Sequence, residues 1–299
     1  MIITSTRLVL RPTQKLVLVP LGDLHHNAPG HDRERFLEVI EWIRKTGKRA
    51  DRKVLVTGMG DYLDTLSASE RRGLGAAGLH ESTRERIEHM MLDDLKDLYD
   101  DLKPIARHFL CLVEGNHTYR FQEASFGPLV GKTTTQVLAE KLNVPYMGVC
   151  GVVVVELTSG DGPTASKMPF KVLLHHGFGN ASTKGASIMQ MLKLRERFPA
   201  MNLYVMGHNH VKIATTMEGI DVRRRKGGQW RMAPMVQAFV RSASFLRGYI
   251  EGEAVTGFSG SYVEEKCLVP AGLGVVTANL RWKMDSKGRA CGFTVHTQE

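Results

Sequence analysis

Short apolar runs that each end in polar residues beside a glycine most constrain what this chain can fold into. Such runs, bounded by turn-forming residues, are typical of buried β-strands. They span residues 15–21, 53–57, 107–113, 170–174 and 202–206. Apolar side chains recur with helical spacing over 32–48, 81–102 and 184–198. Alternating strands and helices predict an α/β core, and the β-rich sequence after Val211 predicts antiparallel additions made of short strands and turns.

The polar residues at the five strand ends have the chemistry of metal ligands. Ligands of open α/β sheets bind just outside the carboxyl ends of strands, so side chains at successive ends can converge. Their oxygen and nitrogen donors suit divalent metals, and burying so many imidazoles and carboxylates without a metal would be costly. The candidate residues are Asp23, His25, Asp61, Asn116, His117, His175, His176, His208 and His210.

Two pairs of candidates are separated by a single residue. Asp23 and His25 form one pair, and His208 and His210 form the other. On an extended segment this spacing points both side chains to the same side. We therefore expect each pair to be able to chelate a metal ion.

The motifs D-x-H, G-D, G-N-H, H-G and G-H-x-H occur in this order between Asp23 and His210. In this order, each after an apolar run, they resemble the motifs of the calcineurin-like metallophosphoesterase superfamily. The turn-rich segments 257–262 and 270–274 resemble phage and prophage members. The resemblance implies an α/β (α+β) fold in which two mixed β-sheets pack as a sandwich flanked by helices. We expect a single domain over 1–299, with core motifs in 15–215 and a β-rich C-terminal elaboration in 216–299.

The resemblance also implies a cofactor of two divalent metal ions. Mn²⁺, Fe and Zn²⁺ are all candidates, because a mixture of nitrogen and oxygen ligands does not select one of them. The first ion would be held by Asp23, His25, Asp61 and His210, and the second by Asp61, Asn116, His176 and His208. Asp61 would bridge them. The H-G motif favours His176, but a slip of one residue along the strand would substitute His175.

The implied reaction is hydrolysis of a phosphoester. The metals would activate a water that attacks phosphorus, and His117 would act as the general acid, oriented by Asp64 or another nearby carboxylate. The sequence departs from a common family pattern because Thr118, not an acidic residue, follows the G-N-H motif. Arg120 is a candidate for binding a substrate phosphate through paired hydrogen bonds, with an ordinary surface arginine as the alternative.

Charge indicates the class of substrate. Lys plus Arg outnumber Asp plus Glu by 40 to 31, and the pI is near 9.4, which favours polyanionic partners. We therefore expect a phosphodiester substrate, nucleic acid or nucleotide, as in nuclease-like members. One alternative is a phosphomonoesterase acting on proteins or small molecules. Another is a catalytically silent nucleic-acid-binding module on the same fold, which the complete motif set argues against.

The remaining composition bears on location. The chain has no stretch of about 18 or more consecutive apolar residues, and charges lie between Met1 and Arg11, where a signal peptide would need its apolar region. We therefore expect a soluble, cytoplasmic protein without a membrane partner. Its four cysteines are far apart, which indicates neither a disulfide framework nor a thiolate metal site.

Overall fold

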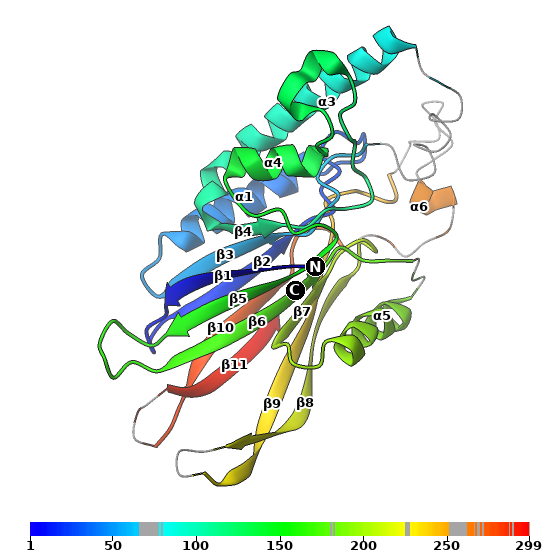
Figure 1. Cartoon of the computed structure of the whole chain (residues 1–299). Helices are drawn as coiled ribbons and strands as arrows, with labels where there is room; N and C mark the ends of the chain where they lie inside the picture. The colour runs from blue at the N-terminus through cyan, green and yellow to red at the C-terminus, as the bar shows by residue number, and fades with distance from the viewer. Residues whose placement is uncertain are drawn as a thin grey trace.

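Two β-sheets stack face to face in the computed structural model, with helices on both outer sides (Figure 1). The fold class predicted from the sequence is therefore confirmed. The structure describes residues 1–65, 78, 80–179, 181, 183–224, 228–250, 262–265, 267, 270, 272–286, 288 and 290–298. Most of segment 257–262 lies outside these residues.

Within the described residues, the first sheet has six strands and the second has five. The order of the first is β1-β5-β6-β7-β9-β8, formed by Ile2–Val9, Cys150–Thr158, Lys167–His175, Leu203–Met206, Trp230–Ser242 and Lys212–Arg224. The order of the second is β11-β10-β2-β3-β4, formed by Ala290–Gln298, Thr277–Met284, Lys15–Leu21, Arg52–Gly58 and Phe109–Leu112. The α-helices are α1 Arg33–Gly47, α3 Glu81–Leu102, α4 Thr134–Leu142, α5 Lys184–Arg197 and α6 Tyr262–Glu265, and 3-10 helices span Lys103–His108 and Ala124–Leu129.

The continuous apolar sequence of β2 reflects burial on both of its faces. Leu16 and Leu18 pack between the two sheets, in the cluster that also contains residues of β5 and β6. Val17 and Val19 point the other way and pack in the cluster under α1, α3 and α4. A strand buried on both faces needs apolar residues at successive positions, not at alternate ones.

Helix α5 covers the outer face of the six-stranded sheet. Met191 and Leu194 pack with Leu173 of β6 and Tyr204 of β7. The structure is thus layered as helices, sheet, sheet and helix. Among the described residues, no helix is both long enough and apolar enough to cross a membrane.

Four strands differ from the sequence predictions. Strand β1 was not predicted, because its sequence has no continuous apolar run and its pairing with β5 is what identifies it. Strands β8 and β9 have 13 residues each, whereas short strands were expected after Val211. Strand β4 begins only at Phe109, because the preceding residues, with Pro104 near their start, form a 3-10 helix.

The strand directions place the five predicted loops together. Strands β2, β3 and β4 run parallel, and β6 runs parallel to β7. The loops that follow these strands therefore lie at the carboxyl ends of strands from both stacked sheets, where side chains from the two sheets can meet.

Candidate metal centre

The loops after β2, β3, β4, β6 and β7 bring their polar side chains into one continuous cluster. It contains three groups in which the nitrogen and oxygen donor atoms all lie within 4.8 Å of one another. These groups are Asp23 with His25 and His210, Asp61 with His176 and His208, and His25 with Asp64 and His117.

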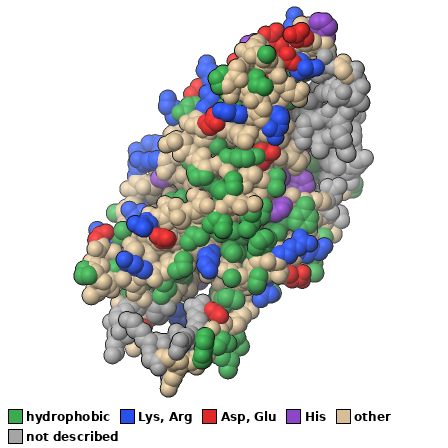
Figure 2. All heavy atoms as spheres, in the orientation of Figure 1, with side chains coloured by type: hydrophobic (Ala, Val, Ile, Leu, Met, Phe, Trp, Pro, Cys, Tyr) green, Lys and Arg blue, Asp and Glu red, His purple; other side chains and the backbone are tan. Residues whose placement is uncertain are grey.

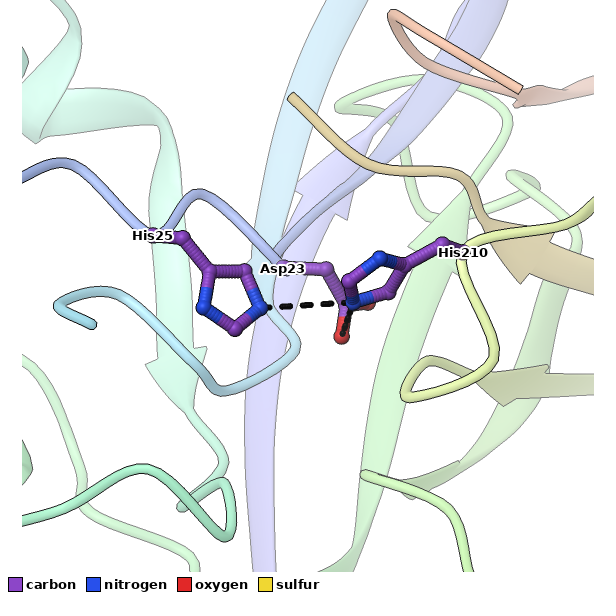
Figure 3. A group of neighbouring side chains, drawn as sticks. All are labelled: Asp23, His25 and His210. Atoms are coloured by element: carbon purple, nitrogen blue, oxygen red, sulfur yellow. Dashed lines mark hydrogen bonds and ion pairs between the residues drawn. The ribbon is translucent and has the colours of Figure 1, made fainter. Parts of the chain in front are cut away.

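The first group joins the loop after β2 to the loop after β7 (Figure 3). The Nε2 atoms of His25 and His210 are 3.3 Å apart, and His210 Nε2 lies 3.7 Å from Asp23 Oδ1. Asp23 and His25 are buried. Three donors from two distant segments thus face one point.

The second group is arranged around Asn116 and Asp61. Asn116 Oδ1 lies 2.9 Å from His176 Nε2 and 2.8 Å from His208 Nδ1. Asp61 Oδ2 lies 3.2 Å from His176 Nε2 and 3.9 Å from His25 Nε2. Asp61 therefore lies between the first two groups.

The backbone of these loops is not extended, so the one-residue spacing does not act as expected: Asp23 and His25 still share a donor group, but His208 and His210 do not. Asp23, His25, Asp61, His208 and His210 have φ values of 49°, 47°, 48°, 77° and 53°. Such left-handed conformations cost free energy for residues other than glycine, and they persist where surrounding bonds hold them. The chain turns sharply as each strand ends, and His208 and His210 consequently fall into different groups.

The glycine of the G-N-H motif makes room for Asp61. A Cβ atom on Gly115 would lie 1.9 Å from Asp61 Oδ1. The backbone N–H of His117, two residues later, donates to the same oxygen at 2.8 Å. The motif therefore needs glycine at this position so that its backbone can approach the carboxylate.

The structure distinguishes the two adjacent histidines. His176 is buried, and its Nδ1 lies 2.8 Å from the carbonyl oxygen of Met59, which leaves Nε2 directed at Asp61 and Asn116. His175 lies outside the donor groups. Its Nδ1 accepts the N–H of Gly177 at 2.9 Å, and its ring packs edge-on against Phe178.

His117 is oriented through one of its ring nitrogens. Its Nδ1 lies 2.9 Å from the carbonyl oxygen of Thr65 and 3.2 Å from Asp64 Oδ1, and the same Asp64 oxygen lies 2.9 Å from His25 Nδ1. Burial alone would lower the pKa of His117, but its bond to Asp64 and the charge of Asp61 raise it to about 9. Asp64 thus fixes two imidazoles at once.

The buried carboxylates and imidazoles shift one another's pKa values. Burial raises the pKa of Asp23 to about 6, against the opposing charge of His176. Burial would also raise the pKa of Asp61, but His176 and His25 bring it below its usual range. Burial would lower the pKa of His176, but Asp61 raises it to about 9. Burial dominates for His208, whose pKa falls to about 4.

The donor set fits divalent metal ions. Within the part of the chain that the structure describes, neither Asp23 nor Asp61 forms an ion pair with Lys or Arg, although both are almost fully buried. Buried carboxylates need compensating positive charge, which imidazoles supply only when protonated. Carboxylate, amide and imidazole donors facing a common point are a set that Mn²⁺, Fe and Zn²⁺ accept.

Arg120 and Thr118 are engaged with neighbouring segments. Arg120 is exposed, and its guanidinium donates to the carbonyl oxygen of Gly131. The hydroxyl of Thr118 lies 3.2 Å from that of Thr134. Neither residue belongs to the donor groups.

Two serines that support the cluster were not found from the sequence. Ser242 Oγ donates to Asp23 Oδ2 at 3.0 Å, and Ser244 Oγ donates to the carbonyl oxygen of Asp23 at 2.9 Å. They follow the last motif by more than thirty residues. No local pattern marks them, and only the pairing of β9 with β7 brings them to the site.

The chain matches no family model and no curated protein. Among solved structures, it is similar to Vps29 of Chaetomium thermophilum, with 12% identity, a TM-score of 0.33, and coverage of 94% of this chain and 96% of that one. A predicted phosphoesterase of Streptococcus pneumoniae has 10% identity, a TM-score of 0.31 and coverage of 95% and 98%. GAP50, an anchor in the inner membrane complex of Plasmodium, has 10% identity, a TM-score of 0.38 and coverage of 96% and 90%.

At these levels of similarity the neighbours do not determine what this chain does. Its own fold and side chains are more informative. Two stacked mixed sheets with Asp, Asn and His donors at their carboxyl ends form the arrangement implied by the resemblance to calcineurin-like metallophosphoesterases.

Proposed function

We propose that this chain is a phosphoester hydrolase that works with two divalent metal ions. The observation that carries the proposal is the pair of donor groups that meet at Asp61, with the separately oriented His117 beside them. The first ion would be held by Asp23, His25, Asp61 and His210, and the second by Asp61, Asn116, His176 and His208. Two ions at one site lower the pKa of a water and neutralise phosphoryl oxygens.

The chain's own residues supply the remaining chemistry. His117 has Nδ1 engaged by Thr65 and Asp64, so its Nε2 is the atom that holds a proton for the leaving-group oxygen. Its side chain is 23% exposed, which lets a substrate reach it. Asp64 keeps the ring oriented, and its bond to His25 directs the Nε2 of His25 toward the first ligand set.

The substrate class follows from charge. The formal net charge is +9, and Lys and Arg side chains are spread over the face seen in Figure 2. A positive surface raises the local concentration of polyanions and speeds their association. We therefore place a phosphodiester of a nucleic acid or nucleotide ahead of a phosphomonoester.

The test is hydrolysis by the metal-stripped chain after addition of Mn²⁺. The substrates are bis-p-nitrophenyl phosphate, p-nitrophenyl phosphate, and single- and double-stranded DNA and RNA. We expect cleavage of diesters that chelation abolishes. Cleavage of the monoester alone would overturn the substrate class. Absence of metal-dependent cleavage of every substrate would overturn the enzymatic function.

Two variants test the roles of individual residues. Asp61→Ala should abolish both metal binding and activity. His117→Ala should keep the metals but slow cleavage by roughly 10² to 10⁴-fold, most strongly for substrates with poor leaving groups. Measured metal content separates the two effects. Loss of the metals from His117→Ala would contradict the role assigned to His117.

A further inference from the structure

A fully buried arginine lies beside the proposed centre and has no role in the chemistry above. Arg241, near the end of β9, is 1% exposed. Its Nη1 donates to the carbonyl oxygen of Gly207 at 2.6 Å, and its Nη2 donates to Gln190 Oε1 at 2.6 Å. Nη2 also lies 3.0 Å from the sulfur of Met206. These acceptors are all neutral, and among the described residues no carboxylate lies within ion-pair distance of Arg241. Burial lowers its pKa to about 10, and the charge of Asp23 only partly opposes this.

Gln190, on α5, connects Arg241 to the loops that follow β6 and β7. Its Oε1 accepts from Asn209 Nδ2 at 2.9 Å as well as from Arg241, and its Nε2 donates to the carbonyl oxygen of Phe178 at 3.0 Å. Phe178 follows the H-G motif, and Asn209 lies between His208 and His210. One amide side chain thus connects the loop after β6 with the loop after β7.

The loop that Arg241 holds contributes ligands to two donor groups. It supplies His208 to one donor group and His210 to the other, and both residues have positive φ. The N–H of Gly207 donates to the carbonyl oxygen of His176 at 2.7 Å, so a shift of Gly207 would also be transmitted to His176. Fixing the Gly207 carbonyl therefore fixes donors of both groups.

We propose that Arg241 and Gln190 are positioning residues that set the spacing of His176, His208 and His210 for binding both metal ions. The inference rests on the proposed metal centre. Replacing residues that hydrogen-bond to metal ligands, or that hold the ligand loops, typically lowers metal affinity by about 10- to 100-fold. The arginine is suited to this task because its planar fork donates in two fixed directions, here to Gly207 and to Gln190.

The chain offers a matched control between the same two elements. Arg195 of α5 donates through Nε to Gln237 Oε1 of β9 at 2.7 Å. This pair has the same chemistry as the pair of Gln190 and Arg241, with the two residue types exchanged between helix and strand. Gln237 Nε2 donates to the carbonyl oxygens of Pro199 and Met201, which lie away from the ligand loops. Loss of this pair should weaken the docking of α5 without changing the ligands.

The experiment compares Mn²⁺ binding by the metal-stripped full chain and its variants, using calorimetry and the electron paramagnetic resonance of bound Mn²⁺. Melting temperatures are measured in parallel. Arg241→Met and Gln190→Met should bind Mn²⁺ about 10- to 100-fold more weakly with an altered resonance signal. Arg241→Lys should recover part of the affinity because an ammonium can still donate to Gly207. Arg195→Met should bind like the wild type even where its melting temperature falls.

Wild-type affinity and signal in both Arg241→Met and Gln190→Met would overturn the inference. So would an equal loss of affinity in Arg195→Met, because the effect would then come from helix docking in general. If Arg241→Met does not fold, Gln190→Met decides, since Gln190 is only partly buried. A wild-type chain that binds neither Mn²⁺ nor Zn²⁺ would refute the proposed centre itself. A chain that binds Mn²⁺ but hydrolyses nothing would refute the proposed function and leave the positioning test intact.

Discussion

Replacing Asp64 by Asn isolates the interaction that orients His117. One Asp64 oxygen lies 3.2 Å from Nδ1 of His117 and 2.9 Å from Nδ1 of His25. This carboxylate is one of the groups that raise the pKa of His117 from 6.5 to about 9. Asp61 also contributes and stays in place, so the variant should lose only part of the rise. We expect the pKa of His117 to fall by roughly one to two pH units, equivalent to about 1 to 3 kcal/mol.

The sign of the effect on stability follows from the direction of this change. A histidine whose pKa is raised by folding stabilises the fold fully below its unfolded value of 6.5, and the contribution is lost as the pH rises through about 9. Asp64→Asn should therefore lower the stability of the metal-stripped chain at pH 6, with a smaller effect at pH 10.

The assay is a nuclear magnetic resonance titration of the imidazole signals in the metal-stripped chain, with His117→Ala used to assign the resonance. Asp101→Asn is the control. Asp101 Oδ2 lies 3.0 Å from His26 Nε2, so this substitution changes a similar carboxylate–imidazole contact outside the donor groups. An unchanged His117 titration in Asp64→Asn would refute the reasoning. So would an equal shift in Asp101→Asn.

Two further predictions concern the metal ligands. His176→Ala should lose at least one Mn²⁺ ion, whereas His175→Ala should bind Mn²⁺ with an affinity within a few-fold of the wild type, because of these two histidines only His176 faces Asp61 and Asn116. Calorimetry on both variants checks this, and the reverse result would exchange the two roles. Mn²⁺ affinity should rise up to about tenfold per pH unit between pH 7 and 9, because the pKa of His176 near 9 means that binding must displace its proton. Calorimetry in buffers with different ionisation enthalpies should detect the released proton, and an affinity independent of pH would contradict the shift.

Much of the fold could be predicted because β2 and its neighbours carry their signal locally. The continuous apolar sequence of Lys15–Leu21 indicates a strand buried on both faces, and its two opposite faces do contact two different core clusters. The sequence of β1 could not be interpreted this way. Its residues are largely exposed or partly exposed, and it forms a strand because it pairs with β5, almost 150 residues away. Pairing between distant segments leaves no local periodicity.

The candidate site was predictable to a similar degree. The motifs name residues that the structure brings within reach of one another, from Asp23 in the first loop to His210 in the last. The conformation of those loops was not predictable from spacing, because positive φ at Asp23 and His208 depends on bonds made between loops. One example is the N–H of His208, which donates to Asp23 Oδ1 at 2.9 Å.

The segment after the last motif contributes more to the centre than its sequence indicates. Arg241 holds the loop of His208 and His210 through Gly207, while Ser242, the next residue, holds the carboxylate of Asp23. The first and last ligand loops are therefore fixed by two adjacent residues of one strand. Because β9 lies beside β7 in the sheet and bonds to both ligand loops, a displacement of its end would disturb ligands of both donor groups. The relative position of the two groups thus depends on a strand that contributes no donor to either of them.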